Sequence, residues 1–183
     1  MSRPRLAGPL GRRDAAAMVL AAVAVNVLGA LGVPFTTPDA AWFQALELPA
    51  FYPPNWAFGV VWPILYALMG VAVVLVYREG RARGAADGVT ATAASWVPRD
   101  GETRVALGLF AVQLVVNVSW SPVFWGLRRI DLGLVVLAAV VVLASVTAVA
   151  FARVDRRAGL LLVPYIAWVA FATVLNGAIV WLN

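Results

Sequence analysis

Aromatic and uncharged polar side chains recur at helical spacing in three apolar segments of this sequence. Residues three or four positions apart lie on one face of a helix, so each segment would present a continuous stripe of these side chains. The stripes comprise Phe58, Trp62, Tyr66 and Met69; Gln113, Asn117, Trp120, Ser121 and Phe124; and Tyr165, Trp168, Ala172 and Asn176. Flat aromatic walls with a few neutral hydrogen-bonding groups suit a large planar apolar molecule better than an ion or a sugar. We therefore predict a shared cavity for such a ligand.

The same three segments each contain an internal proline, at Pro63, Pro122 and Pro164. Within a membrane helix, proline removes one N–H and frees a carbonyl that needs another partner. These defects are positions where neutral polar groups can meet a ligand.

A simpler alternative is that the aromatic side chains form a belt at the membrane surface and that the amides join helices. That interpretation suits Tyr77 and Asn26. It fits Trp62, Trp120 and Trp168 less well, because each lies beyond the first turn of its segment and beside a polar residue or a proline.

The composition excludes several common kinds of site. The chain has no Cys and no His, which removes disulfides, thiolate metal sites, a cysteine nucleophile and the commonest general base, metal ligand and haem ligand. The formal net charge is +5, but the arginines form short clusters between apolar runs and no basic face for nucleic acid. No metal or resident cofactor is predicted.

Five apolar runs are long enough to cross a hydrocarbon core of about 30 Å, which takes roughly 20 helical residues. The chain is 63% hydrophobic, with a mean hydropathy of +0.88. The first run is too long for a signal peptide, and its Ala-x-Ala lies in its middle. We predict an all-α membrane protein with a tail over 1–14 and one five-helix domain over 15–183, whose spans cover 15–33, 56–77, 105–127, 132–152 and 158–182.

Two of the connecting segments carry distinct signals. The loop after the first span is acidic, and Thr37, Pro38 and Asp39 predict an N-cap and first turn of a short helix that ends near Leu46. The segment 80–104 is rich in Gly, Ala and Arg without an apolar period, which predicts a flexible linker. The five spans, as drawn, contain no Asp, Glu, Lys or Arg, which disfavours charge-coupled transport.

Three segments together resemble the TspO/MBR family of tryptophan-rich sensory proteins, which is related to the mitochondrial translocator protein. They read "LPAFYPPNWAFGVVWPILYALMGVA", "LFAVQLVVNVSWSPVF" and "LLLVPYIAWVAFATVLN". The resemblance implies a bundle of five transmembrane helices, commonly a homodimer, that binds porphyrins such as protoporphyrin IX and haem. Sterols are implied less, because Asn176 is followed by Gly177 and no basic residue where the animal proteins have a Tyr and a basic residue.

The family's functional positions carry over onto residues of this chain, and most coincide with the stripes. The resemblance implies ligand-binding roles for Trp42, Pro53, Pro54, Trp62, Asn117, Trp120, Tyr165, Trp168 and Ala172. Together with Phe58, Tyr66, Ser121 and Phe124 from the stripes, they form the predicted site. We expect Trp62 and Trp168 to face each other across a cavity that is covered by the loop bearing Trp42.

The resemblance, together with this site, implies three alternative functions. The leading one is a binding and sensing protein for tetrapyrroles. The second is an enzyme that degrades porphyrin with light and oxygen, as reported for some bacterial relatives, with Trp62 and Trp168 as its candidate catalytic residues. The third is a passive facilitator of porphyrin or lipid movement across the bilayer.

For a homodimer, Ala144, Ala148 and Ala152 offer a small-residue face on the fourth span, which packs either between chains or within one chain.

The arginines predict the orientation of the chain. One side of the membrane collects twelve of them and the other only Arg128 and Arg129, which places the N-terminus in the cytoplasm and the C-terminus outside. Arginine at every basic position and frequent Ala and Val suggest a GC-rich bacterium, hence a plasma membrane.

Because the arginines place the C-terminus outside, a C-terminal alkaline phosphatase fusion should be active and a C-terminal fluorescent protein dark. The reverse pattern would contradict the orientation.

Overall fold

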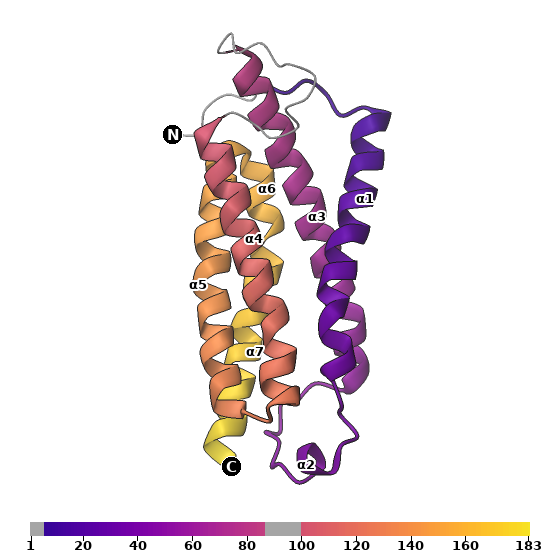
Figure 1. The fold of residues 1–183 in the computed structure, drawn as a ribbon, viewed down its shortest axis with the longest axis vertical. Coiled ribbons are helices and arrows are strands. Elements are labelled where there is room, and N and C mark those ends of the chain that lie inside the picture. Colours follow the sequence, from indigo (N-terminus) through magenta and orange to yellow (C-terminus); the bar gives the residue numbers. More distant parts are fainter. Residues whose placement is uncertain (1–5, 87–99) are drawn as a thin grey trace.

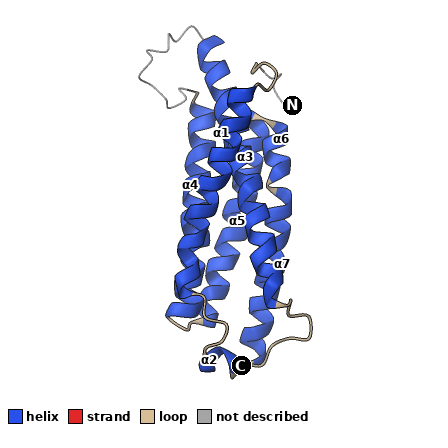
Figure 2. Ribbon diagram, turned by 90° about the vertical axis from the view of Figure 1, so that its right-hand side faces the viewer, coloured by secondary structure: helices blue, strands red, loops and turns tan. Residues whose placement is uncertain are grey.

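The computed structural model describes residues 6–86 and 100–183, and within them every regular element is a helix (Figure 2). Five helical stretches are long and apolar enough to cross a membrane: Arg12–Phe35, Asn55–Ala86, Gly101–Gly126, Ile130–Val154 and Arg156–Leu182. They lie side by side in one elongated bundle (Figure 1). The predicted all-α fold with five membrane spans is confirmed.

Two of the spans change their helix type along their length, and a third is interrupted between two α-helices. The first span is α1 (Arg12–Gly29) followed by the 3₁₀ turns of η1 (Ala30–Phe35). The third span is α4 (Gly101–Ser121) followed by the π-helical η2 (Pro122–Gly126). The fifth span is α6 (Arg156–Leu161) followed by α7 (Val163–Leu182). The second and fourth, α3 (Asn55–Ala86) and α5 (Ile130–Val154), are continuous. Pro122 and Pro164 coincide with breaks, whereas Pro63 lies inside unbroken α3.

The loop between α1 and α3 carries the predicted short helix, but its start differs from the prediction. Helix α2 spans Ala41–Gln44, and its N-cap is Ala40, with no side-chain cap. Thr37 is instead the first residue of a turn, in which its carbonyl accepts a bond from the Ala40 N–H at 3.1 Å. The Gln44 amide donates to the Pro38 carbonyl at 2.7 Å and ties the turn to the helix.

Helix α3 is longer than its hydropathy predicts, and the expected linker over 80–104 is correspondingly shorter. The helix has 32 residues, or about 48 Å, which exceeds the hydrocarbon core and leaves its last turns for charged residues. Glu79 there is fully buried: its carboxylate accepts the N–H groups of Leu6 and Ala7 at 2.8 and 3.0 Å. It also pairs with Arg83, 3.4 Å away. At the far end of the expected linker Gly101 already begins α4, and residues 87–99 lie outside the described part of the chain.

The bundle has two distinct ends. At one end the loop that carries α2 meets the C-terminal residue Asn183, whose side-chain oxygen accepts the Glu47 N–H at 3.0 Å (Figure 1). We call this the α2 end. The opposite end carries Glu79 and Arg83, and there the Arg83 guanidinium donates to the Val154 carbonyl at 2.8 Å, joining α3 to the turn between α5 and α6.

Small residues allow helices to approach closely at two places. A Cβ atom on Gly70 of α3 would lie 2.5 Å from the backbone nitrogen of Ala22 of α1. A Cβ atom on Gly159 of α6 would lie 2.6 Å from the Cβ of Ala152 and 2.7 Å from the carbonyl oxygen of Ala148. Ala148 and Ala152 of the fourth span therefore contact α6 within the chain. A dimer through this alanine face stays a prediction.

Replacing Gly70 with Ala should separate α1 from α3 and destabilise the fold by about 1–3 kcal/mol, the usual cost of overpacking. Gly59→Ala on the same helix is the matched control, because nothing lies within 4 Å of its Cβ position. We expect a lower thermal unfolding midpoint in detergent for Gly70→Ala and an unchanged or higher midpoint for Gly59→Ala. Equal midpoints for both variants would contradict the close approach.

Candidate ligand cavity

A cavity of about 550 Å³ lies between the spans, toward the α2 end of the bundle. Its walls come from α1 and η1, from the first turns of α3, from α4 and η2, and from α7, while Pro38, Phe43 and Tyr52 of the loop close one end. None of the lining residues that the structure describes carries a charge. The space is therefore an apolar chamber with a few neutral hydrogen-bonding groups.

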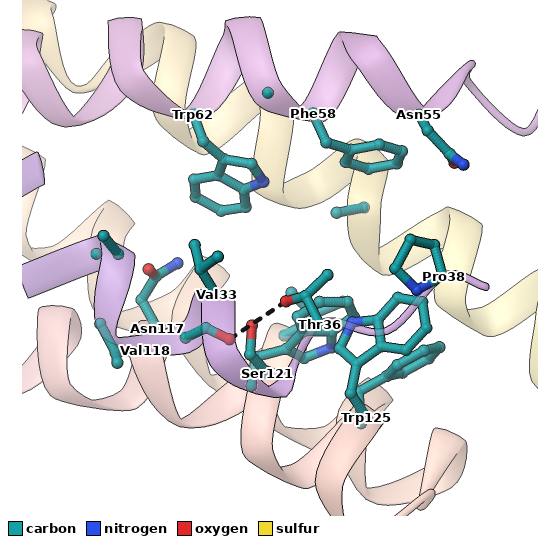
Figure 3. Close-up of a pocket in the computed structure, with 18 of the residues that line it drawn as sticks. Val33, Thr36, Pro38, Asn55, Phe58, Trp62, Asn117, Val118, Ser121 and Trp125 are labelled. Atoms are coloured by element: carbon teal, nitrogen blue, oxygen red, sulfur yellow. Dashed lines mark hydrogen bonds between the residues drawn. The ribbon is translucent and has the colours of Figure 1, made fainter. Parts of the chain in front are cut away.

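Most of the predicted site residues line this cavity. They come from three helices that are far apart in the sequence, and the close-up shows α3 facing the η1 and η2 walls across the space (Figure 3). The lining residues among those predicted are Phe58, Trp62, Tyr66, Asn117, Trp120, Ser121, Phe124 and Ala172.

Two predicted residues of the fifth span lie behind the wall instead. The Trp168 ring packs edge-on against Phe58 with centroids 5.8 Å apart, and the Tyr165 ring packs edge-on against Trp62 at 6.4 Å. Neither belongs to the lining, whereas Ala172 one turn further along does. Trp168 thus packs behind Phe58, which itself lines the cavity. Trp62 and Trp168 therefore do not face each other across the cavity, as the sequence had led us to expect.

The loop residues Trp42, Pro53 and Pro54 also lie outside the lining. Trp42 packs on Phe124 and Trp125, with ring centroids 6.0 and 5.7 Å apart, so it covers the wall from the loop side. The two prolines stand between lining residues of the loop and of α3, and the Pro54 carbonyl accepts the Ala57 N–H at 2.9 Å as the helix begins. Their fixed backbone angles set the direction in which the chain enters α3.

Hydrogen bonds between neutral side chains join the walls. The Tyr66 hydroxyl donates to the Asn117 side-chain oxygen at 2.7 Å and so links α3 to α4. The Trp120 indole donates to Asn176 at 3.3 Å, and the Asn176 amide donates to the Ile130 carbonyl at 2.8 Å. Trp62 stacks on Tyr66, with centroids 5.3 Å apart and planes inclined at 29°. These contacts fix the orientation of the rings that face the cavity.

Gln113 and Tyr165 form a second layer of polar contacts next to the cavity. Both side chains are fully buried, and the Tyr165 hydroxyl donates to the Gln113 side-chain oxygen at 2.9 Å. Because this pair links α4 to α7 as the Tyr66 bond links α3 to α4, the three wall helices are tied together by uncharged groups.

Trp125 lines the cavity although the sequence did not predict it. It lies in the π-helical segment, where the Leu127 N–H donates to the Pro122 carbonyl five residues back at 2.9 Å. Because a π-helical turn is wider than an α-helical one, Phe124 and Trp125 both point into the bundle, where they are only 2% and 7% exposed. The Trp125 indole N–H has no acceptor, which costs about 1–3 kcal/mol for a buried donor.

The first span, the loop and the first residue of α3 supply further lining residues that periodicity did not reveal, among them Asn26, Thr36, Tyr52 and Asn55. Asn26 also acts as the contact between helices that its type predicts, because its amide donates to the Pro63 carbonyl at 3.3 Å. Burial raises the pKa of the Tyr52 phenol above its ordinary value, so this group stays neutral at physiological pH.

The fold and the cavity define a polytopic helical membrane protein with an uncharged, aromatic internal pocket. The chain belongs to the TspO/MBR family, whose sequence profile matches residues 18–182, and the predicted resemblance is confirmed.

Three relatives illustrate the range of the family. The tryptophan-rich protein TspO of Chlorobaculum tepidum is 38% identical over 157 residues, which cover 85% of this chain and 89% of that protein. Protein CrtK of Rhodobacter capsulatus is 35% identical over 162 residues, covering 88% and 89%. The human translocator protein is 38% identical over 135 residues, covering 74% and 70%.

Replacing Tyr66 with Phe should weaken the link between α3 and α4. The ring would remain against Trp62, but the Asn117 oxygen would lose its donor inside the bundle, at a cost of about 1–3 kcal/mol. We expect a lower unfolding midpoint than for Tyr77→Phe, where the hydroxyl accepts a bond from Arg81 at 3.4 Å on the exposed side. A Tyr66→Phe midpoint equal to that of the wild type would show that the bond contributes nothing.

Proposed function

We propose that this chain is a membrane-embedded binding and sensory protein for tetrapyrroles such as protoporphyrin IX and haem. The observation that carries the proposal is the uncharged cavity of about 550 Å³, walled by the rings of Phe58, Trp62 and Trp120. Its volume falls within the range of about 300–1,000 Å³ that is usual for small-molecule pockets.

The chemistry of the walls favours a planar, apolar ligand. A tetrapyrrole offers two flat faces for stacking, and each aromatic contact contributes on the order of 1 kcal/mol besides the area that it buries. Burying a charge inside the cavity would cost far more, because the described lining offers no opposite charge. The carboxylates of protoporphyrin IX or haem would therefore have to stay at the edge of the cavity. The neutral groups of the walls suit a few polar substituents at the edge of a ring.

The names of relatives support this proposal. The tryptophan-rich sensory protein of Cereibacter sphaeroides is 33% identical over 168 residues, which cover 88% of this chain. We extend the sensory role to this chain by that similarity. We further propose that the chain forms a homodimer in a bacterial plasma membrane, with the orientation that its arginines predict.

A second candidate function is light-dependent breakdown of the bound porphyrin. One observation favours it: Trp62 lines the cavity and stacks on Tyr66, which places two oxidisable rings beside the ligand. Trp168 suits this role less well, because Phe58 stands next to it on the cavity side.

Titration of the purified protein with protoporphyrin IX in the dark, followed by the shift of the Soret band, tests the binding proposal. Trp62→Ala should weaken the affinity about tenfold, since losing roughly 1.4 kcal/mol of stacking corresponds to one decade. Trp181→Ala is the control, because that ring is 89% exposed and lies outside the lining. Equal affinity in the wild type and the folded Trp62→Ala variant would contradict the proposed site.

Illumination of the same samples separates the two candidates. A stable Soret band in the light supports binding alone, whereas its light-dependent loss indicates turnover. In that case Trp62→Phe should retain most of the binding and lose the turnover, because phenylalanine is much harder to oxidise.

A further inference from the structure

The first span changes its packing partner beside the cavity. In its α-helical part it lies on α3, where the Asn26 amide donates to the Pro63 carbonyl at 3.3 Å. Less than two turns later it lies on α4 instead, because a Cβ atom on Gly32 of η1 would be 2.8 Å from the Ser121 hydroxyl oxygen. The close-up shows Val33 of η1 and Trp62 of α3 on opposite sides of the space (Figure 3). The start of α3 and η1 therefore stand apart across the cavity.

The cavity is not enclosed, and its exposed lining residues locate an opening between these two segments. On α3, Trp62 lines the space, whereas Ile64 lies outside the lining and is 56% exposed. Pro63 lies between these two faces, since each residue rotates the helix by about 100°; it lines the cavity and is exposed, as is Gly59 one turn earlier. On η1, Val33 lines the cavity and is 65% exposed.

The opening lies within the membrane-spanning part of the bundle. Gly59 and Pro63 follow the first residue of α3 by about 6 and 12 Å along the helix axis. The exposed side chains that flank the opening on both spans are large and apolar: Leu28, Leu31, Val60 and Ile64. Such surface faces the hydrocarbon of the bilayer, so lipid chains and not water meet this opening.

Water is a poor occupant of the cavity. A buried water needs about two to four polar partners, and apolar cavities stay dry. Most polar side chains of the lining already bond to one another or to the backbone: Tyr66 to Asn117, Trp120 to Asn176 and Asn26 to the Pro63 carbonyl. A void would forfeit dispersion contacts along the whole lining. The space of about 550 Å³ is thus most stable when a hydrocarbon fills it.

We propose that, when no other ligand is bound, the acyl chain of a bilayer lipid enters between η1 and α3 and occupies the cavity. The ligand class of this site is a linear hydrocarbon chain with a polar end. The polar end stays at the membrane surface, where Thr36 and Asn55 are exposed at the α2 end of the lining. Any other ligand of the cavity must displace the chain. The inference concerns the unliganded cavity and does not rest on the proposed tetrapyrrole function.

A phosphatidylcholine that carries a diazirine at the end of one acyl chain tests the inference. The full chain is reconstituted in nanodiscs that contain this lipid and no porphyrin, irradiated, digested and mapped by mass spectrometry. In the wild type we expect adducts on Asn117 and Leu137, which line the cavity and are only 6% and 3% exposed. Adducts on Val115, which is 71% exposed on the outside of α4, report ordinary contact with the surrounding lipid.

Gly59→Trp should abolish the adducts on Asn117 and Leu137 and leave those on Val115. Nothing lies within 4 Å of the Gly59 Cβ position, so the indole can grow at the edge of the opening without disturbing the bundle. Val60→Trp is the matched control, because it adds the same ring one residue further on, outside the lining, and should leave the interior adducts in place.

Adducts on Val115 alone in the wild type would overturn the inference. Interior adducts that persist in Gly59→Trp would overturn it as well, and so would their loss in both variants, because the opening would then not control entry. A wild type that shows the interior adducts but does not bind protoporphyrin IX would contradict the proposed function and support this inference.

Discussion

Hydrogen bonds between uncharged side chains hold the cavity open in a setting where packing tends to close it. Close-packed interiors leave few voids, because every gap forfeits dispersion contacts along its lining. Here the bond from Tyr66 to Asn117 and the bond from Tyr165 to Gln113 join three wall helices. Neither tyrosine ring can move into the space without breaking its own bond in a medium that offers no water to replace it.

The buried charged side chains among the described residues, Glu79, Arg83 and Asp155, lie away from this arrangement. The buried carboxylate of Glu79 lies at the opposite end of the bundle, where it is satisfied by two backbone N–H groups and by Arg83. Because Arg83 also reaches the carbonyl of Val154, the cluster fastens the segment before α1 and the turn after α5 to the end of α3. Buried ions therefore anchor one end of the bundle, and neutral contacts shape the cavity toward the other.

Hydropathy and helical periodicity were sufficient to predict the five spans and the three faces that meet at the cavity, because both depend on local spacing. They did not place Trp168 behind Phe58, since a stripe of residues covers a broad arc and does not say which edge faces inward. They missed Glu79 because hydropathy marks the end of the apolar stretch and not the end of the helix. They missed Trp125 because Pro122 signals a break without revealing that the following turn is π-helical.

The π turn at Pro122–Gly126 also bears on how the family's sequences are to be compared. A π turn holds one residue more than the α turn that it replaces, and each residue rotates an α-helix by about 100°. A relative that lacks a single residue here would keep the same helices and turn a different side chain toward the ligand. A one-residue gap in an alignment at this point therefore changes which side chain faces the cavity, even where every neighbouring letter matches.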